Sequence, residues 1–555
     1  FSSIKDDNVG NPFDTNGDGL ATSPARGDWY TIQFRDASID TACVLDSTSV
    51  LYGGNGSYGS VTFTNASGTI KNSILAHGYY YGVRCEGNSA PLVSDVVLQD
   101  NREDPIAMSL LSNPTFQNVT FDANGTKGIR ILEGTLSSNA TLNKRDVAGI
   151  TNIAYIVDNL TINPGATLTI APGVVIKFTQ YYQGISVQGG LKADGTQSQR
   201  IIFTSLYDDS NGGDTNNDGS TSSPNKGNWN SIDFANSSLD SVNSLKKCDF
   251  RYGGGYQYSY EYGLARIYSS KVVIDSCRFT LSSSSGIGIF GSADPTITNT
   301  EITAVNYTPI TMSMFANPTF SNNTFLNVGY AAIGIKAETY SQNATIPLRD
   351  FGGYTNITYV LWGASTINSG TVITIPAGAV FKDYGFYVDG ALKVLGTSGN
   401  KVVFTHSSDD SYGNPMDTNG DGTATSPSIN TAYRLFFNDQ SVDAEDTVQH
   451  AIFRYANYAV DLQQAAPRIS NCLFSRDDWG IRLNGVSGPT VDNCTFSNLD
   501  DAPLLMSLAA SYTATGTNVI SGTTRRAIGI VNETLAADAT MSKRNFAGVN
   551  NIPYL

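Results

Sequence analysis

The sequence contains little charge, and positive charge least of all. Only 15% of its 555 residues are charged, with 34 Lys and Arg against 49 Asp and Glu, so the formal net charge is −15. Long surface helices carry charged faces, and a chain with so few charges is not expected to form many of them. Nucleic acid is not an expected partner either, because binding to phosphate requires a basic face.

Cysteines, histidines and long hydrophobic runs are also scarce. Six cysteines with no CxxC pair give no support to a disulfide scaffold or to Cys-based zinc or redox chemistry. The three histidines are scattered. No run of about 18 apolar residues exists, so no membrane insertion is expected. What the chain does have is 54 glycines and 40% hydrophobic residues, which are sufficient for a continuous core.

The chain repeats itself with a long period of about 200 residues, and self-similarity at a fixed period is typical of repeat architectures. The motif Asp-Thr-Asn-Gly-Asp-Gly, with Asn for its first Gly in the second copy, stands at 14–19, 214–219 and 417–422. A second motif, related to Lys-Arg-Asp-Val-Ala-Gly, stands at 144–149, 348–353 and 543–548. The long period predicts three β-helix repeats in one continuous rod, at 1–155, 156–358 and 359–555.

The beginning of the sequence falls inside a repeat. Phe1-Ser2-Ser3 corresponds to Phe203-Thr204-Ser205, which in the second repeat follows a strand-rich passage at 168–178. We therefore expect the first repeat to be truncated at its start, and the 555 residues to be a window from a longer repetitive chain.

The sequence also has a shorter period of about 22–23 residues, and this period indicates the fold. A coil this short cannot bury its apolar face alone, so successive coils must stack. The segment from Pro467 to Phe474 returns on this period as the segment from Pro489 to Phe496. Runs such as 115–121 alternate apolar and polar residues, as strands do. The pattern predicts an all-β parallel β-helix with inserted Asp/Asn/Gly-rich loops.

One recurring slot in these coils holds asparagine. Its members are Asn118, Asn322, Asn471 and Asn493. Asparagine tolerates a left-handed backbone bend better than most residues, so we expect these side chains to be structural.

The order of the motifs resembles a known superfamily. Leu-Thr-Ile-Ala-Pro-Gly-Val-Val-Ile-Lys-Phe at 168–178, Gly-Gly-Leu-Lys-Ala-Asp-Gly-Thr at 189–196 and the Asp-Thr-Asn-Gly-Asp-Gly motif follow one another. In this respect the chain is similar to the pectin-lyase-like right-handed parallel β-helix superfamily, especially its extracellular bacterial members. The resemblance implies a right-handed coil and a location outside the cell or on its surface. It does not select a function, because the superfamily contains polysaccharide lyases and hydrolases, adhesins and passive stalks.

The Asp-Thr-Asn-Gly-Asp-Gly motifs are candidate calcium sites. They place side-chain oxygens at alternate positions of a glycine-containing turn, as the first half of an EF-hand loop does, and a carboxylate from a preceding Asp-Asp pair can add a ligand. The predicted ligands are Asp7, Asp14, Asn16 and Asp18, then Asp209, Asp214, Asn216 and Asp218, and finally Asp410, Asp417, Asn419 and Asp421. The alternative is an Asx-rich turn without metal, since Asn, Asp and Gly favour turns anyway.

Three other features have both a functional and a structural interpretation. Tyr256, Tyr258 and Tyr260 alternate along a strand, where exposed rings could stack on sugars or simply cover the coils. Arg476 with Asp477 and Asp478 is the best candidate for acid–base catalysis, yet serines replace it in the second repeat, which favours an exposed turn. Cys472 and Cys494 share one slot on adjacent coils, close enough for a disulfide, although stacked free thiols are the preferred interpretation.

The Asp- and Asn-rich motifs, which are the candidate functional residues, occur once in each repeat. An enzyme instead concentrates its catalytic residues in one place. The sequence therefore favours a non-catalytic, calcium-braced structural or adhesive segment of an extracellular stalk or fibre. Its expected partners are a glycan or cell-surface ligand, neighbouring repeats, or further copies of the chain. A carbohydrate-binding or polysaccharide-cleaving surface protein is the alternative.

Overall fold

The computed structural model describes residues 1–132, 134–255, 259, 263–432, 435–535 and 538–555. Its contacts divide the chain into two compact units. Unit 1 comprises Phe1–Ser284 and Ala293–Glu301, and unit 2 comprises Ser285–Ser292 and Ile302–Leu555. The three predicted repeats are a division by sequence similarity, whereas these two units are a division by contacts.

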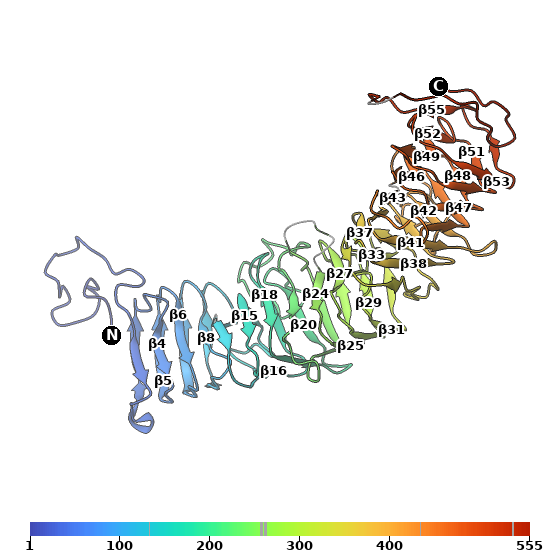
Figure 1. Ribbon diagram of the computed structural model, residues 1–555. Helices are drawn as coiled ribbons and strands as arrows, with labels where there is room; N and C mark the ends of the chain where they lie inside the picture. Colours follow the sequence, from blue (N-terminus) through green and yellow to red (C-terminus); the bar gives the residue numbers. More distant parts are fainter. Residues whose placement is uncertain (133, 256–258, 260–262, 433–434, 536–537) are drawn as a thin grey trace. The chain divides into compact units, whose positions relative to one another are not determined.

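Unit 1 is a stack of coils built from short strands, and all pairs between its described strands are parallel (Figure 1). One wall contains β1 (Ile32–Arg35), β4 (Gly59–Thr64), β6 (Tyr81–Glu86), β8 (Ile106–Met108), β11 (Ile129–Ile131), β14 (Tyr155–Val157), β17 (Val175–Phe178), β20 (Ile201–Ser205), β23 (Cys248–Arg251) and β26 (Arg278–Thr280). A second wall contains β12 (Gly134–Leu136), β15 (Asn159–Ile162), β18 (Gly184–Val187), β21 (Ile232–Phe234) and β24 (Gly263–Tyr268).

Two further walls complete unit 1. The first coils contribute β2 (Val44–Asp46), β3 (Ser49–Leu51), β5 (Thr69–Ala76), β7 (Leu92–Gln99), β9 (Thr115–Gln117) and β10 (Thr120–Asp122). The later coils contribute β13 (Ala140–Leu142), β16 (Thr167–Ile170), β19 (Gly190–Asp194), β22 (Ser244–Lys246), β25 (Val273–Asp275) and β28 (Thr296–Thr298). A single turn of 3₁₀ helix, Asp40–Ala42, is the one helical element among the described residues.

Unit 2 repeats this architecture. Its longest wall contains β27 (Ser285–Phe290), β30 (Ile310–Met312), β33 (Ile333–Ile335), β36 (Tyr359–Leu361), β39 (Val380–Lys382), β42 (Val402–Thr405), β45 (Ala451–Arg454), β48 (Leu473–Ser475), β51 (Thr495–Ser497) and β54 (Val519–Ser521). A second contains β34 (Thr339–Tyr340), β37 (Ser365–Ile367), β40 (Phe386–Val388), β43 (Leu435–Phe437), β46 (Tyr458–Gln463), β49 (Trp479–Asn484), β52 (Leu504–Met506) and β55 (Ile528–Ile530).

The third wall of unit 2 contains β35 (Ala344–Thr345), β38 (Val372–Pro376), β41 (Ala391–Leu395), β44 (Thr447–Gln449), β47 (Arg468–Ser470), β50 (Thr490–Asp492) and β53 (Thr513–Thr515). The remaining strands are β29 (Glu301–Thr303), where the boundary between the units falls, β31 (Thr319–Ser321) and β32 (Thr324–Leu326). The predicted all-β parallel β-helix is therefore confirmed.

The shorter of the two sequence periods sets the register of the core. Phe474 lies opposite Phe496 on the next coil, and their rings stack with centroids 4.8 Å apart and planes 5° apart. Phe453 stacks on the other side of Phe474 at 5.2 Å. All three are buried, and burial of one such side chain stabilises the fold by about 1.5–3 kcal/mol. Equivalent residues thus form ladders through the coils.

The asparagine slot has the predicted conformation. Asn118, Asn322, Asn471 and Asn493 have φ between 49° and 53°, in the left-handed region. These bends join β31 to β32, β47 to β48 and β50 to β51 across two walls, and β9 to β10 within one wall, which is a structural role. Cys472 and Cys494 are free, buried thiols, and the Cys472 Sγ donates to the carbonyl of Ser470 at 3.2 Å.

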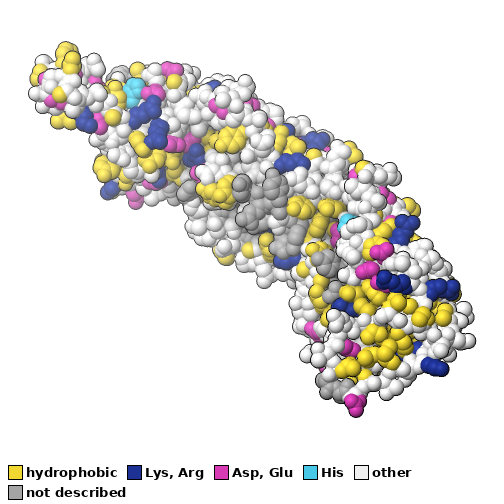
Figure 2. Space-filling view, turned by 90° about the horizontal axis from the view of Figure 1, so that it is seen from above, with side chains coloured by type: hydrophobic (Ala, Val, Ile, Leu, Met, Phe, Trp, Pro, Cys, Tyr) yellow, Lys and Arg dark blue, Asp and Glu magenta, His cyan; other side chains and the backbone are white. Residues whose placement is uncertain are grey.

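Charged side chains on the face seen in Figure 2 are sparse, and both signs are mixed over the described residues. No helix among the described residues has the length and apolar character needed to cross a bilayer.

Candidate metal centres

The three Asp-Thr-Asn-Gly-Asp-Gly motifs lie in long loops that interrupt the coils. Loop 1 (4–31) precedes β1, loop 2 (206–231) connects β20 to β21, and loop 3 (406–432) follows β42. The twelve predicted ligand residues are all half-buried. Each loop therefore holds its acidic side chains partly out of water, which raises the energetic cost of leaving them unpaired.

Loop 2 brings three carboxylates to one point. Asp209, Asp214 and Asp218 each place an oxygen within 4.8 Å of the others. Asn216 lies between them in sequence, and its amide nitrogen donates to Oδ2 of Asp218 at 2.8 Å. The amide therefore turns its nitrogen towards one carboxylate oxygen, while the Oδ1 atoms of both residues stay without a hydrogen bond.

Local hydrogen bonds impose the turn in every loop. The first aspartate of the motif accepts the backbone N–H of the following glycine: Asp14 from Gly19 at 2.9 Å, Asp214 from Gly219 at 3.3 Å and Asp417 from Gly422 at 2.9 Å. These three glycines have φ of 71° or 72°, where a side chain would be strained. The spacing of the motif is thus a requirement of the turn.

Buried oxygen atoms without a hydrogen-bond donor are concentrated in these loops. They are Oδ1 of Asp7, Asp18, Asp209, Asn216, Asp218, Asp410, Asp417, Asn419 and Asp421. Leaving a buried polar atom unsatisfied costs about 1–3 kcal/mol, and more when it is charged. A hard cation such as calcium, which takes six to eight oxygen ligands, fits this set of donors. An Asx turn alone accounts for the Asp14-type hydrogen bonds but not for the unpaired oxygens.

Electrostatic repulsion acts in the same place. Loss of hydration, followed by the charges of Asp14 and Asp18, raises the pKa of Asp7. Loss of hydration and the charge of Asp417 likewise raise the pKa of Asp410. Neighbouring carboxylates repel one another when all of them are ionised. A divalent cation bound between them would attract each carboxylate and offset that repulsion.

Several residues of these centres were not predicted from the sequence. A hydroxyl donates to Oδ2 of the last aspartate: Thr22 to Asp18 at 2.5 Å, Ser222 to Asp218 at 2.5 Å, and Thr425 to Asp421. Their recurrence at one fixed distance after that aspartate was a usable signal. Within each Asp-Asp pair only the second residue belongs to the centre. The first is buried and structural, and Asp409, for example, receives two hydrogen bonds from Arg454 Nη1.

A buried lysine supports each of the two later loops. Lys177 in β17 and Lys382 in β39 are fully buried, and burial lowers the pKa of each to about 8. The Lys177 ammonium donates to the carbonyl of Gly213 at 2.7 Å, and that of Lys382 donates to the carbonyls of Asp409 and Met416 at 3.0 and 3.1 Å. These contacts attach the loops to the wall of the β-helix.

The candidate catalytic cluster does not converge. Asp477 is completely buried, and its two oxygens accept the backbone N–H groups of Ala456 and Ser475 at 2.9 and 3.1 Å. Burial raises its pKa. Arg476 donates instead to the hydroxyl of Tyr455 at 3.2 Å. Asp477 therefore holds the turn between neighbouring coils, a structural role, but the expectation of an exposed turn is wrong for this residue because its carboxyl group is buried to accept these two backbone N–H groups.

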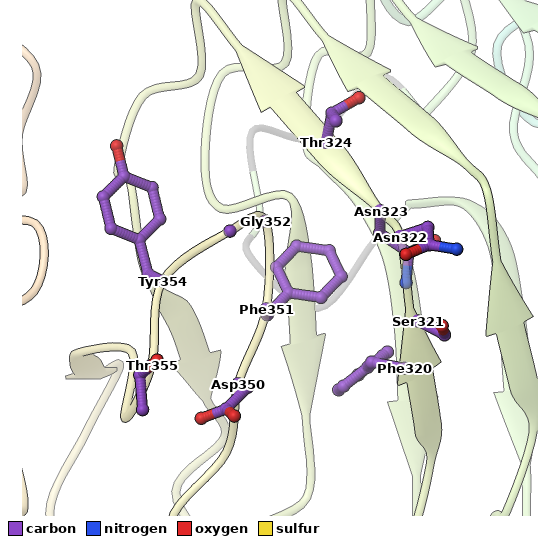
Figure 3. Close-up of a pocket in the computed structure, with 11 residues that line it drawn as sticks. Phe320, Ser321, Asn322, Asn323, Thr324, Asp350, Phe351, Gly352, Tyr354 and Thr355 are labelled. Carbon is purple, nitrogen blue, oxygen red and sulfur yellow. The ribbon is translucent and has the colours of Figure 1, made fainter.

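Unit 2 also contains an open cavity of about 520 Å³ between two turns of the chain (Figure 3). Phe320 in β31 and Tyr354 in the turn at 350–355 line it from opposite sides, together with the carboxylate of Asp350 and the amide of Asn322. Phe325 stacks near the cavity against Tyr354, with ring centroids 5.7 Å apart. Tyr256, Tyr258 and Tyr260, the tyrosines expected to contact sugars, lie outside the described residues.

The family model described as "Right handed beta helix region" matches residues 26–163 and 215–348. No curated protein and no solved structure matches the chain. The family match agrees with the stacked parallel coils found in each unit. The chain is a right-handed parallel β-helix protein.

Proposed function

We propose that this chain is a non-catalytic, extracellular structural or adhesive β-helix segment, of the kind that forms a stalk or fibre, and that calcium braces its three loops. The observation that carries the proposal is the recurrence of unpaired, buried carboxylate oxygens at the same two positions of each loop, those of Asp7 and Asp18 in loop 1, with an unpaired amide oxygen between them in loops 2 and 3. Calcium at those positions would satisfy the oxygens and attach each long loop to its coils. Extracellular calcium is abundant enough to fill sites of modest affinity.

A calcium titration of the whole chain tests this function. After metal removal with EDTA, calorimetry should detect three calcium ions per chain. The triple variant Asp18→Asn, Asp218→Asn, Asp421→Asn should lose all three while keeping its β-sheet circular dichroism. A folded wild-type chain that binds no calcium at millimolar concentration would overturn the proposal. Cleavage of any polysaccharide in a panel of acidic and neutral polymers would overturn its non-catalytic part.

A second candidate function is binding of a glycan at the cavity of unit 2. The supporting observation is the combination of exposed ring surface at Phe320 and Tyr354 with the polar groups of Asp350 and Asn322. Sugars are recognised by this combination of ring faces and hydrogen-bonding groups. Retention on immobilised polysaccharides should then be lost in Tyr354→Ala. The matched control is Tyr387→Ala, which removes another half-exposed ring of unit 2 outside the cavity.

A further inference from the structure

Loops 2 and 3 fold back in the same way over an earlier coil of their own unit. The carbonyl of Thr215 accepts the backbone N–H of Lys127 at 2.7 Å, and that of Thr418 accepts the backbone N–H of Ala331 at 2.6 Å. Both threonines are buried, at 1% and 0% exposure. Lys127 and Ala331 stand at the same distance before the second sequence motif of their repeats. They are therefore equivalent positions with different side chains.

Because position 127 holds lysine and the equivalent position 331 holds alanine, loop 2 has one additional positive charge beside it. The Lys127 ammonium lies 3.0 Å from Oδ2 of Asp214, a member of the three-carboxylate cluster. Ala331 cannot make this contact with Asp417. Within the described part of the chain, Asp417 forms no ion pair with Lys or Arg, and its Oδ1 is buried without a donor.

The two loops are otherwise closely matched. Each has three carboxylates, one amide oxygen and one buried lysine that donates to its carbonyls. One further difference is that Oδ1 of Asp214 accepts the backbone N–H of Asp218 at 3.0 Å, whereas Oδ1 of Asp417 has no donor. Exchanging the side chains at 127 and 331 is therefore needed to test the charge of Lys127 by itself.

We propose that Lys127 lowers the calcium affinity of loop 2, so that loop 3 is the tighter of these two sites and fills before loop 2. This inference rests on the proposed calcium binding. Affinity in oxygen-ligand sites is tuned by the net charge of the ligands. A unit positive charge about 6 Å from a divalent ion, in surroundings as polar as water, weakens binding by about tenfold. As calcium rises, loop 3 is braced at a lower concentration than loop 2.

A reciprocal exchange in the whole chain tests this order. Asp18→Asn with Asp421→Asn leaves loop 2 as the only intact site, and Asp18→Asn with Asp218→Asn leaves loop 3. Calorimetric titration with calcium at low ionic strength should give loop 3 the lower Kd, by about tenfold. Lys127→Gln should tighten loop 2 and Ala331→Lys should weaken loop 3, each by about the same factor. Added salt should shrink both effects, which loss of packing would not explain.

The controls separate charge from structure. Lys127→Arg should retain the weak affinity of loop 2, and Ala331→Gln should retain the strong affinity of loop 3. If neither loop binds calcium, the proposed function itself fails. If both loops bind with equal affinity, or the exchanges leave the Kd values unchanged, calcium binding stands and the role of Lys127 is refuted.

Discussion

Asp446 occupies the position in its repeat that Asn243 occupies in the preceding one. Asn243 Oδ1 accepts the backbone N–H of Leu191 at 3.1 Å, and Asp446 Oδ1 accepts that of Leu392 at 2.8 Å. The Asn243 amide also donates to the hydroxyl of Ser238 at 2.9 Å. The corresponding Oδ2 of Asp446 is buried near the hydroxyl of Ser441 but makes no hydrogen bond of ordinary geometry. Asp446 thus accepts the same backbone hydrogen bond as Asn243, but its carboxylate has no N–H group to donate to the neighbouring serine.

This substitution predicts a pH dependence of stability. Burial, and then the charges of Asp443 and Glu445, raise the pKa of Asp446 from 3.8 to about 7. Because the folded-state pKa is the higher one, the stability contributed by this carboxyl group is fully present below pH 3.8, the ordinary value, and is lost as pH rises from there to the folded-state pKa of about 7. The full shift corresponds to about 4 kcal/mol in the free energy of unfolding. Urea unfolding of unit 2 should therefore show a lower midpoint at pH 8.5 than at pH 5.5.

Asp446→Asn isolates this effect. The variant should lose the decline between about pH 4 and about pH 7 and be more stable than wild type at pH 8.5. The reverse exchange, Asn243→Asp, should introduce the same decline into unit 1. An unchanged pH slope in both variants would show that Asp446 is not the titrating group.

Calcium should stabilise the chain through the loops. A ligand present at 100 times its Kd stabilises the folded state by about 2.7 kcal/mol per site. Chelation with EDTA should therefore lower the Tm, and Asp218→Asn should remove the contribution of loop 2 only. Asp36→Asn, at an exposed aspartate outside the three centres, is the control and should respond to EDTA as wild type does. A Tm that is insensitive to EDTA would indicate ordinary Asx turns.

The aromatic ladder predicts a large, local loss of stability. Phe474 is buried between Phe453 and Phe496, so Phe474→Ala leaves a cavity that the rigid coils cannot close. The expected cost is about 3–5 kcal/mol. Hydrogen exchange should accelerate in the coils around Phe474 first, because each coil of a solenoid contacts mainly its neighbours. Phe474→Leu, which keeps most of the volume, should cost less than half as much.

The shorter sequence period was sufficient to predict the fold, because each coil pairs with the next one along the chain. Phe474 and Phe496 are one coil apart in the sequence, so they lie opposite each other. The loops were predictable for the same reason, since Asp214 and Asp218 belong to one short turn. The pair of Lys127 with Asp214 was not, because 87 residues separate them and the contact depends on how an inserted loop folds back. The cavity between Phe320 and Tyr354 likewise requires the packing of two distant turns.

The buried Lys382 leads to the last prediction. Its ammonium is the hydrogen-bond donor for the carbonyls of Asp409 and Met416, so Lys382→Met removes both bonds while filling the same space. The bond to Asp409 is buried and that to Met416 is partly buried, so the Asp409 carbonyl carries most of the penalty, about 1–3 kcal/mol when it is left unpaired. Loop 3 should then detach from the wall before unit 2 unfolds. Limited proteolysis should cut loop 3 faster in the variant than in wild type. Lys393→Met, which removes a partly exposed lysine paired with Glu445 on the same unit, should leave that rate unchanged. Equal cleavage rates in the two variants would mean that the loop is held by its other contacts.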